Sequence, residues 1–230
     1  MIKNENQHQV FERLHQCEVL LEKYELAKKY NLYLYSDEIY SRVVFSDQKS
    51  FYSPSINDHC KERVIVANGF SKAYAMTGWR LGVAIGPAEL IEKMSLLLQT
   101  TVSCVSPFLQ QAGIEAIEGD QSAIIAMISE YEERRDLLVK GLNDIPGINC
   151  LMPGGALYVF PNIKETGLTS EEFARYILEE AHVGLLPGTH FGDSGKNFVR
   201  LCFATSEDHI KKGLQRIKAA VLKLKQESSP

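Results

Sequence analysis

One lysine stands in an unusual setting in this sequence. Lys72 lies in the segment GFSKAYAMTGWRLG (residues 69–82), among small and apolar residues and shortly after an apolar run. Partial desolvation in such surroundings favours the neutral amine, which is the nucleophile that forms imines with carbonyl compounds. A lysine in an exposed loop is nevertheless the commoner case in proteins. The segment alone leaves both interpretations open.

Three further side chains could act together with that amine. Asp37 follows the apolar run LYLY (residues 32–35), so we expect it at the carboxyl end of a strand, the edge where open α/β sheets bind ligands. A carboxylate there can keep a ring nitrogen protonated, Tyr40 can donate to an anionic oxygen, and Arg80 can hold a phosphate. Each also has an ordinary explanation, as a helix cap, a half-buried aromatic or a surface ion pair. Together they are the groups that one phosphorylated ring cofactor needs.

Helices and strands that alternate along the chain must position these residues. Apolar residues at three- and four-residue steps predict a helix over residues 12–30, followed by the strand LYLY. The short runs RVIVAN (63–68) and WRLGVAIG (79–86) predict two strands of a covered, parallel-type sheet. After Pro87, the segment AELIEKMSLLLQ has a helical pattern.

The pattern changes beyond Gly119, where a second, α+β domain is predicted. A long helix is expected over residues 121–144, ended by Pro146 and Gly147. A capped helix should begin at Thr169, and a last helix at Ser206. Short strands are expected near residues 149–151, 156–160, 183–186 and 198–203.

Composition excludes several classes of function. The chain has 230 residues, of which 45% are hydrophobic, and its net charge of -4 is spread along the sequence, so neither a nucleic acid nor a membrane is an expected partner. The five cysteines are isolated and are predicted to be reduced, mostly buried thiols rather than metal ligands. With no long apolar run and a polar beginning, we expect a cytoplasmic protein.

Three motifs resemble, in order, landmarks of one enzyme family. SDEIY (36–40), GFSKAYAMTGWRLG (69–82) and FVRLCFATSED (198–208) are similar to segments of the fold-type I pyridoxal-phosphate enzymes. Within that group, the resemblance is to the class I/II aminotransferases close to the prokaryotic-type aspartate aminotransferases, and it runs from about Glu18 to the final helix.

That resemblance implies both a fold and a cofactor. The fold is of the α/β class: part of a fold type I large domain, with a mostly parallel sheet and helices (residues 1–118), followed by a smaller α+β domain (residues 119–230). The cofactor is pyridoxal 5'-phosphate.

The resemblance also implies roles for individual residues. Lys72 forms the imine with the cofactor and then moves a proton between the substrate Cα and the cofactor. Asp37 pairs with the pyridine nitrogen, Tyr40 donates to the ring hydroxyl oxygen, and Arg80 binds the phosphate. Arg200 grips the substrate α-carboxylate, although an arginine that only pins the last strand is an alternative.

Two features of the sequence depart from the family pattern. Ser71 is a further candidate for phosphate binding, but the family often has a serine three residues before the lysine, where this chain has Gly69. The family's N-P-T-G motif is absent: counting back from Asp37 without gaps places its four positions on QVFE (residues 9–12). The resemblance therefore implies that this chain corresponds to the C-terminal part of an aminotransferase.

The expected function is transfer of an amino group between an L-amino acid and a 2-oxo acid. Two alternatives stay open: a non-catalytic, truncated homologue that needs a partner, and a C-S lyase-type relative that uses the same cofactor for β-elimination. A sheet that lacks neighbouring strands exposes an edge, so we expect a homodimer or another oligomer. The sequence leaves the identity of the donor amino acid open.

Overall fold

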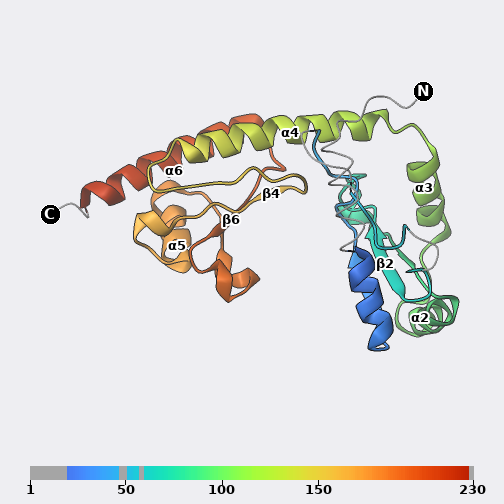
Figure 1. Cartoon of the computed structure of the whole chain (residues 1–230). Helices are drawn as coiled ribbons and strands as arrows, with labels where there is room; N and C mark the ends of the chain where they lie inside the picture. The colour runs from blue at the N-terminus through green and yellow to red at the C-terminus, as the bar shows by residue number, and fades with distance from the viewer. Residues whose placement is uncertain (1–19, 47–50, 57–59, 228–230) are drawn as a thin grey trace, which may run out of the picture. The chain divides into compact units, whose positions relative to one another are not determined.

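The computed structural model describes residues 20–46, 51–56 and 60–227 (Figure 1). The chain forms two compact units, Met1–Ile125 and Ala126–Pro230, and each is treated by itself below. The boundary between them falls inside helix α4 (Ser122–Asn143). The division between residues 118 and 119 expected from the sequence precedes this helix and stays a prediction.

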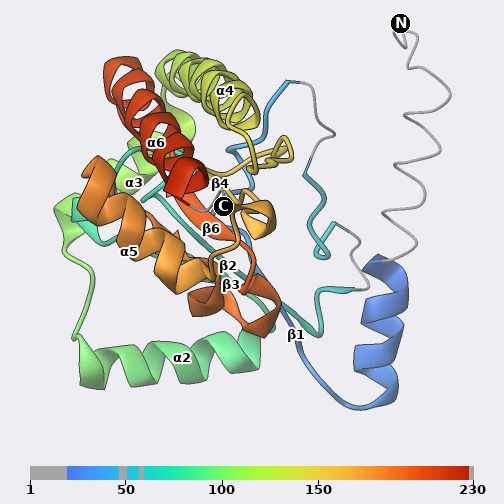
Figure 2. The ribbon, with the colours of Figure 1, turned by 90° about the vertical axis from the view of Figure 1, so that its left-hand side faces the viewer.

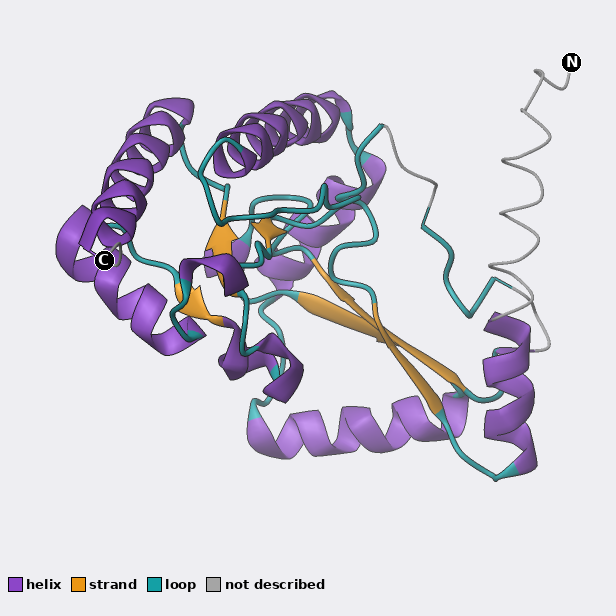
Figure 3. Ribbon diagram, turned by 60° about the vertical axis from the view of Figure 1, so that its left-hand side comes forward, coloured by secondary structure: helices purple, strands orange, loops and turns teal. Residues whose placement is uncertain are grey.

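A three-stranded sheet forms the centre of the first unit. Its strands, drawn in orange in Figure 3, are β1 (Leu34–Asp37), β2 (Val64–Gly69) and β3 (Gly82–Ile85). Their order in the sheet is β1-β2-β3. β1 and β2 run parallel, with Asp37 opposite Ala67. One face of β2 is buried: Val64 and Val66 belong to a core cluster that also includes Tyr24, from the helical residues 20–29.

The expectation that residues 79–86 form a strand of a covered, parallel-type sheet is wrong in two respects. β3 runs antiparallel to β2, and all four of its residues are exposed in the described part of the chain. A parallel connection needs a crossover that is usually helical, whereas residues 70–81 contain turns and only one short 3-10 helix, η2 (Thr77–Trp79). The chain therefore turns back along β2.

Two helices follow β3 in the first unit. α2 (Ala88–Thr101) agrees with its prediction, but α3 (Pro107–Glu118) was not expected. Pro107 suits the first turn of α3 because its fixed φ is helical and no N–H is lost there. Gly113 lowers the helical signal of the sequence, yet its missing side chain allows close packing, since a Cβ there would lie 2.8 Å from Leu81 Cδ2.

The second unit contains a small antiparallel sheet. Its strands are β4 (Tyr158–Val159), β5 (Leu186–Pro187) and β6 (Val199–Cys202), in the order β4-β6-β5. The central strand alternates: Val199 and Leu201 are buried, whereas Arg200 is half-buried and Cys202 exposed. The strands are shorter than predicted, but the combination of helices and sheet confirms the expected α+β class.

Helices α5 (Ser170–Ala181) and α6 (Glu207–Glu227) lie side by side in this unit (Figure 2). The hydroxyl of Tyr176 donates a hydrogen bond of 3.0 Å to the backbone oxygen of Ala220. The predicted cap is present, because Thr169 and Glu172 form a reciprocal capping box at the start of α5. No helix within residues 20–46, 51–56 and 60–227 combines the length and apolar content needed to cross a membrane.

The cysteines only partly follow their prediction. Cys60 and Cys150 are buried free thiols, as expected, but Cys104 and Cys202 are exposed. Cys202 is exposed because it alternates with buried neighbours along β6. Cys17 lies outside the described residues.

The reactivity of each thiol should depend on whether it is buried or exposed. Burial raises the pKa of Cys150 to about 11 and also raises that of Cys60. The thiolate of Cys150 is then about 100-fold scarcer at pH 8 than that of an unperturbed thiol, so we expect alkylation to be slower by about that factor. Time-resolved alkylation with iodoacetamide, read by peptide mass spectrometry, should label Cys104 and Cys202 first. Equal rates at Cys150 and Cys202 would contradict this description of the core.

Candidate active site

Lys72 and Tyr40 lie together at one edge of the first unit's sheet. The Nζ atom of Lys72 is 5.8 Å from the centroid of the Tyr40 ring, and both residues are half-buried. Tyr40 lies in the turn after β1, and Lys72 lies in the turn after β2. Because these two strands are parallel neighbours, both turns leave from their carboxyl ends, where open α/β sheets bind ligands.

Asp37 ends β1 at the same edge. Its side chain is exposed, and its Oδ1 atom accepts a 3.2 Å hydrogen bond from the backbone N–H of Ile39. Within the described ranges, no second partner of this carboxylate is present. Asp37 can therefore accept a hydrogen bond from a ligand at the strand end without giving up its contact with the turn.

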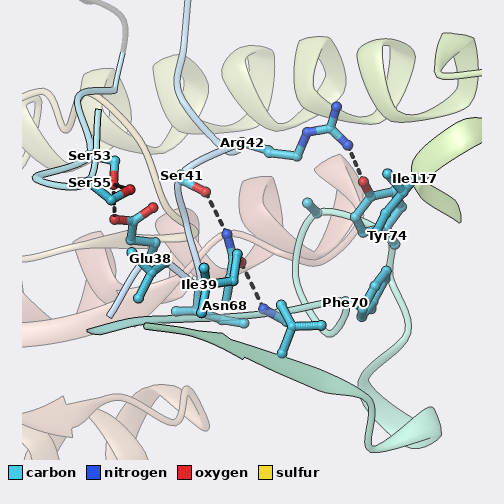
Figure 4. Close-up of a pocket in the computed structure, with 15 residues that line it drawn as sticks. Glu38, Ile39, Ser41, Arg42, Ser53, Ser55, Asn68, Phe70, Tyr74 and Ile117 are labelled. Carbon is cyan, nitrogen blue, oxygen red and sulfur yellow. Dashed lines mark hydrogen bonds between the residues drawn. The ribbon is translucent and has the colours of Figure 1, made fainter. Parts of the chain in front are cut away.

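Glu38, the next residue, has a different role that the sequence did not reveal. Only 6% of its surface is exposed, and its Oε1 atom accepts a 2.6 Å hydrogen bond from the hydroxyl of Ser53 (Figure 4). Its backbone N–H donates to the oxygen of Ala67 on β2. Glu38 thus anchors the turn between Asp37 and Tyr40. Burial alternates along β1, where Leu34 and Ser36 are half-buried and Tyr35 and Asp37 are exposed. Continuing this alternation by one residue would have predicted an inward side chain at Glu38.

Removing the donor to this buried carboxylate should destabilise the first unit. We expect Ser53→Ala to lower the free energy of unfolding by about 1–3 kcal/mol, because Glu38 keeps its burial but loses its hydrogen bond. Urea denaturation followed by circular dichroism measures this change. The control is Ser129→Ala, at an exposed position of α4. Identical midpoints for the two variants would show that the bond to Ser53 contributes nothing.

The turns that carry Tyr40 and Lys72 are linked by their neighbours. The side-chain amide of Asn68, on β2, donates a 3.1 Å hydrogen bond to Ser41, next to Tyr40. The guanidinium of Arg42 bonds the hydroxyl of Tyr74, two residues after Lys72 (Figure 4). These contacts help to hold Tyr40 and Lys72 in place relative to each other.

A cavity of about 330 Å³ adjoins these linking contacts. Glu38, Asn68, Arg42 and Tyr74 are among its lining residues, and none of the six predicted site residues lines it. The cavity is therefore bounded by groups that support the site rather than by the site residues themselves.

Ser71 and Arg80 lie close to Lys72 in sequence. Ser71 is half-buried in the turn after β2. Arg80 is exposed, and its guanidinium donates a 3.1 Å hydrogen bond to the backbone oxygen of Thr77 within its own turn. No hydrogen bond or ring contact joins Arg80 to Lys72 in the part of the chain that is described.

Gly69, at the position where the family often has a serine, is closely packed in the structure. A Cβ at this position would lie 3.1 Å from Ile39 Cδ1 and 3.3 Å from the backbone oxygen of Leu81. The small residue therefore allows the turn after β1 to approach the end of β2. Residues 9–12, where the ungapped count placed the missing motif, lie outside the described residues.

Arg200 belongs to the second unit, on β6 opposite Leu186. Its guanidinium carbon lies 4.4 Å from the centroid of the Tyr158 ring and 4.1 Å from that of Phe191. Among the described residues, no carboxylate pairs with it. A guanidinium that contacts aromatic faces keeps its in-plane N–H donors available for an anion.

Comparisons with known proteins agree on one family. The family model described as "Aminotransferase class I and II" matches residues 15–217. The chain is 43% identical over 199 residues to an aspartate aminotransferase of Pyrococcus horikoshii, covering 86% of this chain and 50% of the relative. It is 39% identical over 195 residues to aromatic-amino-acid aminotransferase 2 of Thermococcus litoralis, covering 84% and 50%.

A solved structure supports the same conclusion. The crystal structure of an aromatic aminotransferase from Pyrococcus horikoshii superposes with a TM-score of 0.85 at 36% identity, covering 90% of this chain and 55% of the other. The chain spans about half the length of the curated relatives it matches.

Proposed function

Because this chain belongs to the class I and II aminotransferases, we propose that it transfers an amino group between an L-amino acid and a 2-oxo acid, with pyridoxal phosphate as its cofactor. One observation carries the proposal: the amine of Lys72 lies over the Tyr40 ring at the sheet edge where Asp37 ends β1. A nucleophilic amine, a phenol and a carboxylate are the groups that such a cofactor requires.

When bound, pyridoxal phosphate supplies a carbonyl that condenses with amines and a ring that accepts the electron pair left when the substrate Cα loses its proton. Lys72 provides the amine that holds the cofactor. Lys72 would also move the proton that leaves the substrate Cα, because its amine can both accept and donate a proton there. The half-buried setting of Lys72 limits the water that could compete for this proton.

Four side chains of the first unit would hold the cofactor's polar groups. Asp37 has an available carboxylate oxygen with which to keep the ring nitrogen protonated. Tyr40 donates its phenol hydrogen to the ring hydroxyl oxygen. Arg80 uses one of its five donors on Thr77, so others are available to the phosphate, and Ser71 adds a hydroxyl there.

Arg200 would bind the substrate. Its side chain has no carboxylate partner within the described residues, and its fork of donors matches the α-carboxylate shared by amino acids and 2-oxo acids. Binding both substrates through that shared group suits a reaction in which one replaces the other.

We also propose that the protein is cytoplasmic and that its domains are residues 1–118 and 119–230. We further propose that it forms a homodimer or another oligomer. Exposed apolar surface supports the oligomer: Ile85 on β3 is 63% exposed, and α2 buries none of its residues. A second subunit would cover surface of this kind.

An isotope experiment tests the proposed reaction. The full chain with pyridoxal phosphate is incubated with ¹⁵N-labelled aspartate or phenylalanine and 2-oxoglutarate, and products are read by mass spectrometry. We expect ¹⁵N-glutamate in a Lys72-dependent reaction. Pyruvate and ammonia from β-chloroalanine, without glutamate from either donor, would instead indicate the β-eliminating alternative. Saturable cofactor binding with neither product would indicate a homologue that is not catalytic by itself.

A further inference from the structure

Two aromatic rings contact the guanidinium of Arg200. Tyr158 reaches the guanidinium from the neighbouring strand β4, and Phe191 reaches it from the short 3-10 helix η4 (Gly188–Phe191). Two ring contacts from different elements restrict the orientation of the guanidinium plane more than a single contact could. An exposed arginine would sample several rotamers and lose more entropy on binding an anion.

The ring of Phe191 is itself supported by other rings. Phe160 contacts Phe191 edge-to-face at a centroid distance of 6.0 Å and stacks on Phe198 at 5.3 Å. Phe198 immediately precedes β6, where it forms an isolated bridge with Asn162, and it lies two residues before Arg200. In extended backbone, side chains two residues apart lie on the same face. The opposite face carries the buried Val199.

The loop that carries Phe191 is tightly closed. The backbone N–H of Gly188 donates a 2.9 Å hydrogen bond to the oxygen of Phe198. A Cβ at Gly188 would overlap the backbone oxygen of Gly195, so only glycine allows the two ends of the loop to approach this closely. The position of Phe191 is thereby fixed by backbone contacts and by the ring of Phe160.

We propose that Phe191 and Tyr158 are positioning residues that hold the guanidinium of Arg200 in the plane in which its N–H fork meets a substrate carboxylate. The inference rests on the carboxylate-binding role proposed for Arg200. Neither ring touches the reacting atoms in this proposal; both act through Arg200. Loss of the Phe191 ring should weaken carboxylate binding about 3- to 30-fold, the range expected for a cation–π contact.

The test uses the full chain without cofactor and has a spectroscopic readout. The arginine Nε–Hε resonances are recorded by ¹H–¹⁵N NMR during a titration with 2-oxoglutarate, and Arg200→Lys identifies the Arg200 signal. In the unchanged chain, ring currents should move this Hε upfield, and the signal should shift saturably with ligand. Phe191→Leu should reduce the upfield shift and raise the dissociation constant, whereas Phe191→Tyr should restore both.

Two further variants make the result specific. Tyr158→Leu removes the other ring and should act in the same direction as Phe191→Leu. Phe108→Leu is the matched control, because Phe108 is 70% exposed on α3 and, among the described residues, has no ring contact with Arg200. Circular dichroism verifies that each variant is folded.

The outcomes separate this inference from the proposed function. If both ring variants keep the wild-type shift and affinity while Arg200→Lys abolishes binding, the positioning role is overturned and the carboxylate role stands. If Arg200→Lys binds 2-oxoglutarate as tightly as the unchanged chain, both roles fail.

Discussion

The Lys72→Ala variant is expected to give no saturable visible absorbance band when it is titrated with pyridoxal phosphate, whereas the unchanged chain gives one. The variant lacks the only amine that lies over the Tyr40 ring among the described residues, so the cofactor has no attachment point at the sheet edge. Amino-group transfer should fall with it, by at least about 10²–10⁴-fold, because the same amine carries the Cα proton. Absorbance titration and the isotope assay measure the two effects.

The matched control for Lys72→Ala is Lys93→Ala, which removes an exposed amine from α2. This variant should bind the cofactor as the unchanged chain does. If the unchanged chain, Lys72→Ala and Lys93→Ala all show the same weak signal without saturation, cofactor attachment at Lys72 is wrong.

The Asp37→Asn variant should keep cofactor binding but slow transfer by about 10²–10³-fold, the usual cost of losing a preorganised electrostatic contact. The amide keeps the shape of the carboxylate and its acceptor oxygen for the Ile39 N–H, but lacks the negative charge that keeps the ring nitrogen protonated. Stopped-flow absorbance after mixing with aspartate isolates this step from later ones. The control is Asp144→Asn, an exposed aspartate beyond α4. Equal rates of amino-group transfer for Asp37→Asn and Asp144→Asn would show that Asp37 has no role in the reaction.

The placement of Asp37, Tyr40 and Lys72 at or just after strand ends could be predicted because it follows from local sequence patterns. An apolar run marks a strand, polar residues mark its end, and the carboxyl ends of parallel neighbours meet at one edge. The structure brings Lys72 and Tyr40 together at such an edge. Glu38 was missed because the sequence shows two adjacent acids without showing which one points inward. Burial and the bond to Ser53 decide that question.

Other features depended on contacts between distant segments. The direction of β3 is set by the short connection from β2, not by its apolar pattern, and so it could not be predicted from residues 79–86 alone. The rings around Arg200 come from β4 and from the loop PGTHFG, more than thirty residues apart in sequence. No local periodicity brings Tyr158 and Phe191 to one guanidinium. The antiparallel pairing of β4 with β6 places Tyr158 opposite Cys202, two residues from Arg200, and η4 supplies Phe191.

The most direct test of the proposed function is to locate the cofactor's attachment point on the unchanged chain. The full chain is equilibrated with pyridoxal phosphate, reduced with borohydride and digested, and the phosphopyridoxyl group is mapped by mass spectrometry. We predict one saturable site, on Lys72. Label spread over exposed lysines such as Lys93 and Lys211, with Lys72 no more reactive than they are, would contradict the central claim.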